Sequence, residues 1–216
     1  MAALTADLRE RIRRLAGMER LLPALDGLPP TYLVGGAVRD LLRGARAIDL
    51  DIAVEGDSRS AARALAERLG GLATVHERFG TATVRTAEVV FDLAATRTET
   101  YAEPGALPEV APAGLVEDLR RRDFSVNAMA VALAGDDLGH LYDPTRGLGD
   151  LEAGVIRTLH AGSFLDDPTR LLRAVRYETR LGFQMDEPTE RAARAAIAQG
   201  AMSTVSGARV RDELMD

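Results

Sequence analysis

The sequence predicts an α+β protein in which strands and helices are followed by an all-helical second part. Up to about Leu119, short apolar runs typical of strands alternate with segments of helical spacing, whereas beyond it the β-like runs thin out. A chain of 216 residues can bury a sizeable core. The border falls between residues 140 and 160, and we place the first domain at residues 1–145 and the second at residues 146–216.

Local patterns give the order of the elements. The first part is predicted to contain a helix over residues 4–21, a strand over 31–34, a helix over 37–43, a strand over 48–54, a helix over 60–69, strands over 81–84 and 89–93, and a Pro- and Gly-rich loop over 104–114. The second part is predicted to contain helices over residues 169–181, 187–199 and 208–215.

Composition indicates an ordinary folded protein, with 46% hydrophobic and 28% charged residues. Uncharged runs such as residues 124–135 are shorter than the roughly 20 residues of a bilayer-spanning helix. We therefore expect no membrane segment and no signal peptide. The chain has no cysteine, which excludes a disulfide framework and thiolate metal sites and makes the cytoplasm the expected compartment.

The formal net charge of −6 opposes attraction of the whole chain to a polyphosphate. Any surface that holds RNA must therefore be local. All 27 basic residues are arginines, a residue suited to bidentate contacts with phosphate, carboxylate or base edges, although a GC-rich coding bias explains the same preference.

Acidic residues alternate with apolar ones in the predicted strand over residues 48–54. Because side chains of a strand alternate between its faces, Asp49 and Asp51 share one face while Leu50 enters the core. Paired carboxylates are hard oxygen ligands that suit Mg²⁺, although a solvated strand face is the other interpretation. Asp92, on a probable adjacent strand, is either a third acid of a two-metal site or a hydrogen-bonded core residue.

A glycine turn precedes this strand. Gly35 and Gly36 follow the predicted strand over residues 31–34 and lead into a helix that contains Arg39. Backbone N–H groups at such a strand–turn–helix junction can hold phosphate groups.

These segments resemble the motif series of class II CCA-adding enzymes and bacterial poly(A) polymerases, within the DNA polymerase beta superfamily. The matching segments, in the family's order, are Leu33–Val54 (motif A), Phe91–Tyr101, Asp118–Ala128 (motif B), Tyr142–Arg157 (motif C), Asp166–Arg170 (motif D) and Ser206–Leu214 (motif E). The resemblance covers residues 30 to 214, and five motifs in series are a specific match.

The resemblance implies a nucleotidyltransferase head with a small mixed sheet, followed by an all-α neck that selects the nucleotide. It implies Asp49 and Asp51 as the ligands of two Mg²⁺ ions, with Asp92 as a further catalytic acid. The nucleotide-binding residues that we expect from it and from the glycine turn are Gly35, Gly36, Arg39, Arg121, Arg122, Asp123, Asn127, Asp167, Arg170, Arg173 and Arg176. Without the other motifs, the Arg121–Asp123 cluster would be a surface ion-pair group.

Motif D suggests how a base could be chosen. Asp167 and Arg170 are three residues apart and would share one helix face, either as an intrahelical ion pair or as a base-selecting pair. An aspartate accepts from an amino group and an arginine donates to a ring nitrogen, so the pair matches the edges of cytosine and adenine and not those of uracil and guanine. Arg173 and Arg176 continue this face, as phosphate ligands or as partners of acids such as Glu178.

The predicted function is template-independent addition of C and A to the 3′ end of tRNA from CTP and ATP, with release of pyrophosphate. CC-only, A-only or poly(A) addition stay open, as does a nucleotide- or RNA-binding fragment without turnover. Three positions depart from the family pattern, namely Ser125, Asp166 and Ala208. We expect the family's helical body and tail, which usually grip tRNA, to be absent, so that this chain alone binds tRNA poorly. The sequence does not indicate the oligomeric state.

Overall fold

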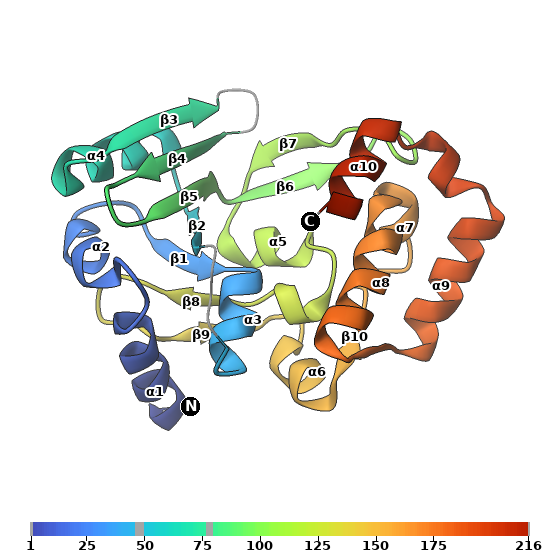
Figure 1. Ribbon diagram of the computed structural model, residues 1–216, viewed down its shortest axis with the longest axis horizontal. Helices are drawn as coiled ribbons and strands as arrows, with labels where there is room; N and C mark the ends of the chain where they lie inside the picture. The colour runs from blue at the N-terminus through green and yellow to red at the C-terminus, as the bar shows by residue number, and fades with distance from the viewer. Residues whose placement is uncertain (1, 46–49, 77–79, 216) are drawn as a thin grey trace.

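A seven-stranded mixed sheet organises the first two thirds of the chain (Figure 1). The computed structural model describes residues 2–45, 50–76 and 80–215. From one edge to the other, the strands are β3 (Leu72–His76), β4 (Thr81–Arg85), β5 (Val90–Ala95), β2 (Leu50–Val54), β1 (Thr31–Val34), β8 (Ala130–Ala132) and β9 (Leu141–Tyr142). Neighbouring strands are antiparallel except β2 and β5, which are parallel. These features confirm the predicted α+β class.

Both faces of the sheet are packed. The larger core joins the sheet to α1 (Ala2–Arg13), α2 (Met18–Ala24), α3 (Gly36–Leu42) and α4 (Ser58–Leu69). On the opposite face, α5 (Leu115–Arg120) buries Leu115 and Leu119 against Tyr32, Val34 and Ala53. Since residues of a strand alternate between faces, Asp51 of β2 lies on the same face as Ala53, outside the larger core.

The rest of the chain is mostly helical. It contains the hairpin β6 (Arg97–Thr100) and β7 (Glu109–Pro112), η2 (Ser125–Asn127), α6 (Gly147–Ala153), β10 (Val155–Ile156), α7 (Ser163–Asp166), α8 (Thr169–Leu181), β11 (Gln184–Met185), α9 (Glu187–Ala198), η3 (Ala201–Thr204) and α10 (Gly207–Met215). The larger core continues into this part through Phe124, Phe164 and Leu171. Figure 1 shows the β6–β7 hairpin reaching from the sheet toward α10. No helix in the described ranges is long and apolar enough to span a membrane.

Several predicted elements are confirmed where caps and apolar spacing mark both ends. The strand over residues 31–34 and the helix over 169–181 match β1 and α8, and α4, α9 and α10 lie within two residues of their predictions. Asp57 caps the start of α4, and Gly70 ends it in the left-handed conformation. The predicted strand over residues 48–54 is described from Leu50 onward, so Asp49 lies outside the described residues.

The predicted single helix over residues 4–21 is wrong, because α1 ends at Arg13 and α2 begins at Met18. Gly17 separates them with a φ of 76°, which side-chain-bearing residues rarely adopt. A Cβ atom there would also lie 2.4 Å from Cγ1 of Val89, so the break is fixed by packing against the β4–β5 turn.

Two other predictions need correction. The predicted loop over residues 104–114 contains β7, which pairs with β6. Strands do thin out beyond Leu119, but the second part is not all-helical, because β10 pairs with β11, and β8 and β9 still extend the main sheet. These four strands have two or three residues each, too few for their periodicity to be recognised.

The cap of α4 leads to a stability prediction. Asp57 accepts hydrogen bonds from the backbone N–H groups of Arg59 and Ser60 and from the Ser60 hydroxyl, which lower its pKa to about 2. Asp57→Ala should lower the free energy of unfolding by about 1 kcal/mol at pH 7 in urea titrations. A depressed pKa stabilises the fold above the unfolded value of about 3.9, and this stabilisation is lost as the pH falls toward 2. Asp57→Asn should keep most of the stability at pH 7 but lose this pH dependence.

Candidate active site

One large cavity brings the predicted site residues together. It has a volume of about 730 Å³ and lies between α3, the β6–β7 hairpin, the segment after α5, and α8. Its walls include Asp51 and every predicted nucleotide-binding residue, namely Gly35, Gly36, Arg39, Arg121, Arg122, Asp123, Asn127, Asp167, Arg170, Arg173 and Arg176. The segments that carry the sequence motifs are thus neighbours in space, although Gly35 and Arg176 are 141 positions apart in the chain.

The two described acids lie side by side and exposed on the face of the sheet that carries α5. Asp51 of β2 is directly opposite Asp92 of β5 in the parallel pair, so the prediction that Asp92 lies on an adjacent strand is confirmed. The Asp92 carboxylate accepts a hydrogen bond of 2.7 Å from the Thr83 hydroxyl on β4. Asp92 lines a second cavity of about 420 Å³, which shares Asp51, Arg121 and Arg122 with the first.

This pair fits a divalent cation by its chemistry, since two exposed carboxylates on adjacent strands offer hard oxygen ligands. Among the described residues, no group of three or more acidic or histidine side chains is arranged to hold a metal ion. The described residues therefore supply two of the three acids that the sequence predicts.

Gly35 lets the backbone approach the acids closely. Its φ of 69° and ψ of −139° are rare for residues with a side chain. A Cβ atom at this position would lie 3.2 Å from Nη1 of Arg122 and 3.7 Å from Oδ2 of Asp51. The glycine keeps open the space between the first strand, the acid and this guanidinium.

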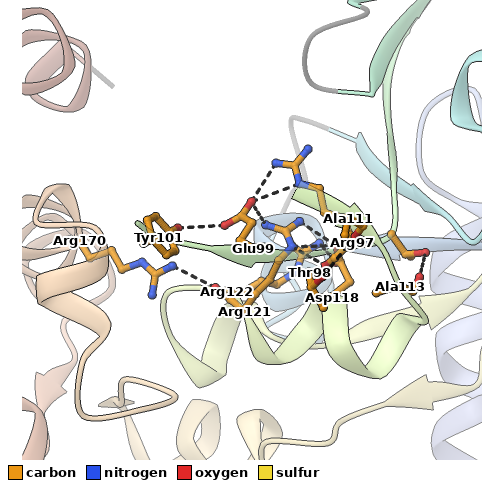
Figure 2. A network of polar contacts seen from close by, with 11 residues as sticks. Arg97, Thr98, Glu99, Tyr101, Ala111, Ala113, Asp118, Arg121, Arg122 and Arg170 are labelled. Atoms are coloured by element: carbon orange, nitrogen blue, oxygen red, sulfur yellow. Dashed lines mark hydrogen bonds and ion pairs between the residues drawn. The ribbon is translucent and has the colours of Figure 1, made fainter. Parts of the chain in front are cut away.

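A buried carboxylate orders the arginines at the junction of the two cavities (Figure 2). Asp118, only 1% exposed, accepts from Nη2 of Arg121 at 2.7 Å, from Nη2 of Arg122 at 2.9 Å and from the backbone N–H of Arg97 at 3.2 Å. Burial raises the pKa of Asp118, but the ion pairs with Arg122 and Arg121 outweigh it and hold the pKa below its usual value.

The two motif B arginines, Arg121 and Arg122, differ in how many of their N–H groups already have a hydrogen-bond partner. Arg121 also donates to Glu99 at 2.7 Å and to the Arg97 carbonyl at 3.0 Å. Arg122 has a buried Nε with no hydrogen-bond partner among the described residues, and its Nη1 lies beside Gly35. Arg121 is thus a structural part of the wall, whereas Arg122 retains donors near the acids.

A second chain of contacts joins the sheet to α8. Arg39, 6% exposed, donates from Nη1 to Oδ1 of Asn127 at 2.8 Å, and Nδ2 of Asn127 donates to Oδ1 of Asp123 at 3.1 Å. Oδ2 of Asp123 forms an ion pair of 2.8 Å with Nη2 of Arg173. Asp123 is the main cause of a raised pKa of Arg173, so this guanidinium stays charged. Arg173 and Arg176 pair with Asp123 and with Glu213 of α10, rather than with Glu178.

The predicted helix face shared by Asp167 and Arg170 is wrong. Asp167 lies between α7 and α8 in an extended conformation, with φ −133° and ψ 95°, because it precedes Pro168. Its carboxylate pairs with Arg209 of α10 rather than with Arg170. Arg170, 4% exposed, donates to the Ser163 hydroxyl at 2.6 Å and to the Arg121 carbonyl at 3.0 Å. Both residues still line the cavity.

Sequence reasoning missed several residues of the cavity and its supports. The missed lining residues include Asp40, Arg97, Tyr101, Tyr177 and Arg180, and the missed supports are Arg209 and Glu213. Arg180 could have been found, since it follows Arg176 by four residues on one helix. Tyr101 donates to Glu99 at 3.0 Å, and burial followed by the Glu99 charge raises its pKa to about 12. No local sequence pattern predicts that Tyr101 and Tyr177 line the cavity.

Comparisons with known proteins agree with this geometry. Residues 31–157 match the family model of the Poly A polymerase head domain. An A-adding tRNA nucleotidyltransferase of Halalkalibacterium halodurans is 45% identical over 186 residues, 85% of this chain and 44% of that protein. A CC-adding tRNA nucleotidyltransferase of Deinococcus radiodurans is 44% identical over 150 residues, 69% of this chain and 40% of that protein. A solved apo form of a CCA-adding enzyme has 42% identity and a TM-score of 0.84, covering 90% of this chain and 47% of that chain.

The chain therefore belongs to the family of class II tRNA nucleotidyltransferases and poly(A) polymerase heads, which confirms the resemblance. It spans less than half the length of each of these three relatives.

The Asp118 network leads to a prediction about the stability of the site. Asp118→Asn removes the charge that holds Arg121 and Arg122 and should lower the free energy of unfolding by about 3 kcal/mol at pH 7, measured by urea denaturation. Glu117→Gln, on the exposed side of the same helix, is the control and should change it by less than about 0.5 kcal/mol. Because the pKa of Asp118 is depressed, its stabilisation should be complete above about pH 4 and be lost below it. Equal changes in the free energy of unfolding for Asp118→Asn and Glu117→Gln would contradict the role of Asp118 in stabilising the site.

Proposed function

We propose that residues 1–145 form the catalytic head and residues 146–216 the nucleotide-selecting neck of an enzyme that adds C and A to the 3′ end of tRNA. The substrates are CTP and ATP, no nucleic-acid template is used, and pyrophosphate is released. The observation that carries this proposal is the exposed Asp51–Asp92 pair on β2 and β5, next to a cavity lined by arginines.

The proposed reaction needs a cation site beside a triphosphate site. The terminal 3′-hydroxyl of tRNA attacks the α-phosphate, a new P–O bond forms, and the bond to pyrophosphate breaks. Mg²⁺, proposed here as two ions, when bound lowers the pKa of the attacking hydroxyl and neutralises the charge of the leaving group. Asp51 and Asp92, together with Asp49, are the proposed ligands. Arg122 and the backbone of Gly35 and Gly36 lie where the phosphates would face these acids.

The proposed choice of base rests on Asp167 and Arg170 at the neck side of the cavity. Among the described residues, the three hydrogen bonds to the Asp167 carboxylate all fall on Oδ1, so Oδ2 is the acceptor that we assign to the amino group of cytosine or adenine. Arg170 donates to the ring nitrogen beside that amino group. Uracil and guanine have the opposite arrangement of hydrogen-bond donors and acceptors at this edge, so they do not pair with Asp167 and Arg170.

A-only addition is the second candidate. The A-adding relative matches 85% of this chain, whereas the CC-adding relative of similar identity matches 69%. The acids and the arginine cavity serve all of these activities equally, and poly(A) addition and nucleotide binding without turnover use the same residues.

The first experiment is a transfer assay. The protein is incubated with Mg²⁺, a tRNA lacking its 3′-terminal CCA and each nucleoside triphosphate, singly and in pairs, and the products are separated on a sequencing gel. We expect C and then A to be added. C alone or A alone would identify a partial activity, and nucleotide binding without any product would favour the binding fragment.

The acids are tested in the same assay. Asp49→Ala, Asp51→Ala and Asp92→Ala should each lower the rate by about 10³-fold or more, because each weakens a site that supplies several kcal/mol of charge stabilisation. Glu88→Ala, on the exposed turn between β4 and β5, is the control and should keep the full rate. Retained activity of Asp51→Ala would refute the assignment of the metal site.

A further inference from the structure

Helix α10 contacts the cavity through polar side chains. None of its residues is buried, so an apolar face does not fix it in place. Two of its side chains, Arg209 and Glu213, are one helical turn apart and meet residues that line the cavity. Glu213 holds Arg176 at 3.1 Å, and Arg209 holds Asp167 at 2.8 Å. The helix thus touches an arginine of the cavity wall and a proposed base-selecting residue at once.

The Arg209 guanidinium joins three segments. Its Nη2 donates to Oδ1 of Asp167, and its Nη1 donates to the carbonyl of Gly105 at 3.1 Å. The N–H of Gly105 in turn donates to the carbonyl of Leu165 at 3.1 Å. Gly105 has a φ of 76°, and a Cβ atom there would lie 2.0 Å from Oγ1 of Thr204. The loop between β6 and β7 is therefore packed tightly enough to anchor one arm of Arg209.

This anchor fixes the rotation of the Asp167 carboxylate. Oδ1 accepts from Arg209 and also from the N–H and hydroxyl of Thr169, at 3.0 and 2.7 Å. With three donors on Oδ1, and none on Oδ2 in the part of the chain that the structure describes, the second oxygen is the one available to a ligand. Arg170 is separately fixed by Ser163 and the Arg121 carbonyl, so it is not the group that orients Asp167.

We propose that Arg209 is a positioning residue that determines base specificity by holding Oδ1 of Asp167, so that Oδ2 accepts from the amino group of cytosine or adenine. This inference rests on the proposed base selection by Asp167 and Arg170. Loss of Arg209 removes the charged donor of Oδ1 and leaves the two Thr169 donors alone to hold the carboxylate against rotation about its Cβ–Cγ bond. The interaction with the amino group is weakened, whereas contacts with the triphosphate, which involve other residues, are kept.

The test is the affinity of the 216-residue protein for each of the four nucleoside triphosphates with Mg²⁺, measured by isothermal titration calorimetry. Arg209→Ala should weaken the binding of CTP and ATP by about tenfold and change the affinity for UTP and GTP by less than about twofold. The preference for C and A therefore falls. Arg209→Lys keeps a charged donor but cannot contact both Asp167 and Gly105 as the guanidinium does, so it should keep part of the preference that Arg209→Ala loses. Arg211→Ala is the matched control, because Arg211 lies on the same helix and its partner is the exposed Asp212.

Thermal melting of each variant checks that it is folded, and α10 buries no residue whose loss would unfold it. An Arg209→Ala variant that binds all four nucleotides equally weakly, or that keeps the full preference for C and A, overturns the proposal. An Arg209→Lys variant whose preference for C and A is no greater than that of Arg209→Ala also overturns the proposal. If the parent protein itself shows no preference, the proposed base selection fails together with the role of Arg209. A parent preference that survives in Arg209→Ala refutes the role of Arg209 alone.

Discussion

The parallel pairing of β2 with β5 is the constraint on which the candidate site depends. All other neighbouring strands of the described sheet are antiparallel. A parallel connection needs a long crossover, and residues 55–89 supply it with α4, β3 and β4. Because register in a parallel pair places opposite residues on one face, Asp51 comes to lie beside Asp92. A shift of one residue in either strand would turn one acid into the larger core.

The arrangement of charge around these acids explains how an acidic protein can present an arginine-rich cavity. Of the residues that the structure describes, eight arginines and five acidic residues line the cavity, which is a local basic excess within a chain of net charge −6. Several of these arginines are held by carboxylates, among them Asp118, Asp123 and Glu213. A fixed guanidinium loses little conformational entropy when it binds an anion. The buried carboxylates keep the arginines in place before a ligand arrives.

The sequence predicted the elements that have strong local signals. A buried apolar run between Pro29–Pro30 and Gly35–Gly36 defines β1, and α8 is amphipathic with Gly182 at its end. Local patterns also placed Asp51 on one strand and Asp92 on a probable adjacent strand, and the pairing of β2 with β5 confirms that the two strands are neighbours. What the sequence could not reveal were pairings over long separations. Arg209 with Gly105 spans 104 positions, and Arg209 with Asp167 spans 42.

Asp167 shows where a local signal existed and was misread. The spacing of Asp167 and Arg170 suggested that they share one helix face. However, the helical conformation is disfavoured for a residue that precedes a proline, and Pro168 directly follows Asp167. The extended conformation turns the Asp167 side chain toward α10 and into the reach of Arg209, instead of along α8. The proline thus separates the proposed base acceptor from the helix that carries Arg170, Arg173 and Arg176.

This separation bears on how relatives with different products can share one fold. The acids on β2 and β5 and the arginines ordered by Asp118 belong to the sheet side of the cavity, where the proposed chemistry is the same for any nucleotide. Asp167 depends on contacts from α10 and from the β6–β7 loop, which lie outside that framework. Changes in those supporting contacts could alter the choice of base without disturbing the acids. The A-adding and CC-adding relatives, 45% and 44% identical to this chain, differ in the nucleotides they add, and a division of this kind lets the choice of base vary while the acids stay in place.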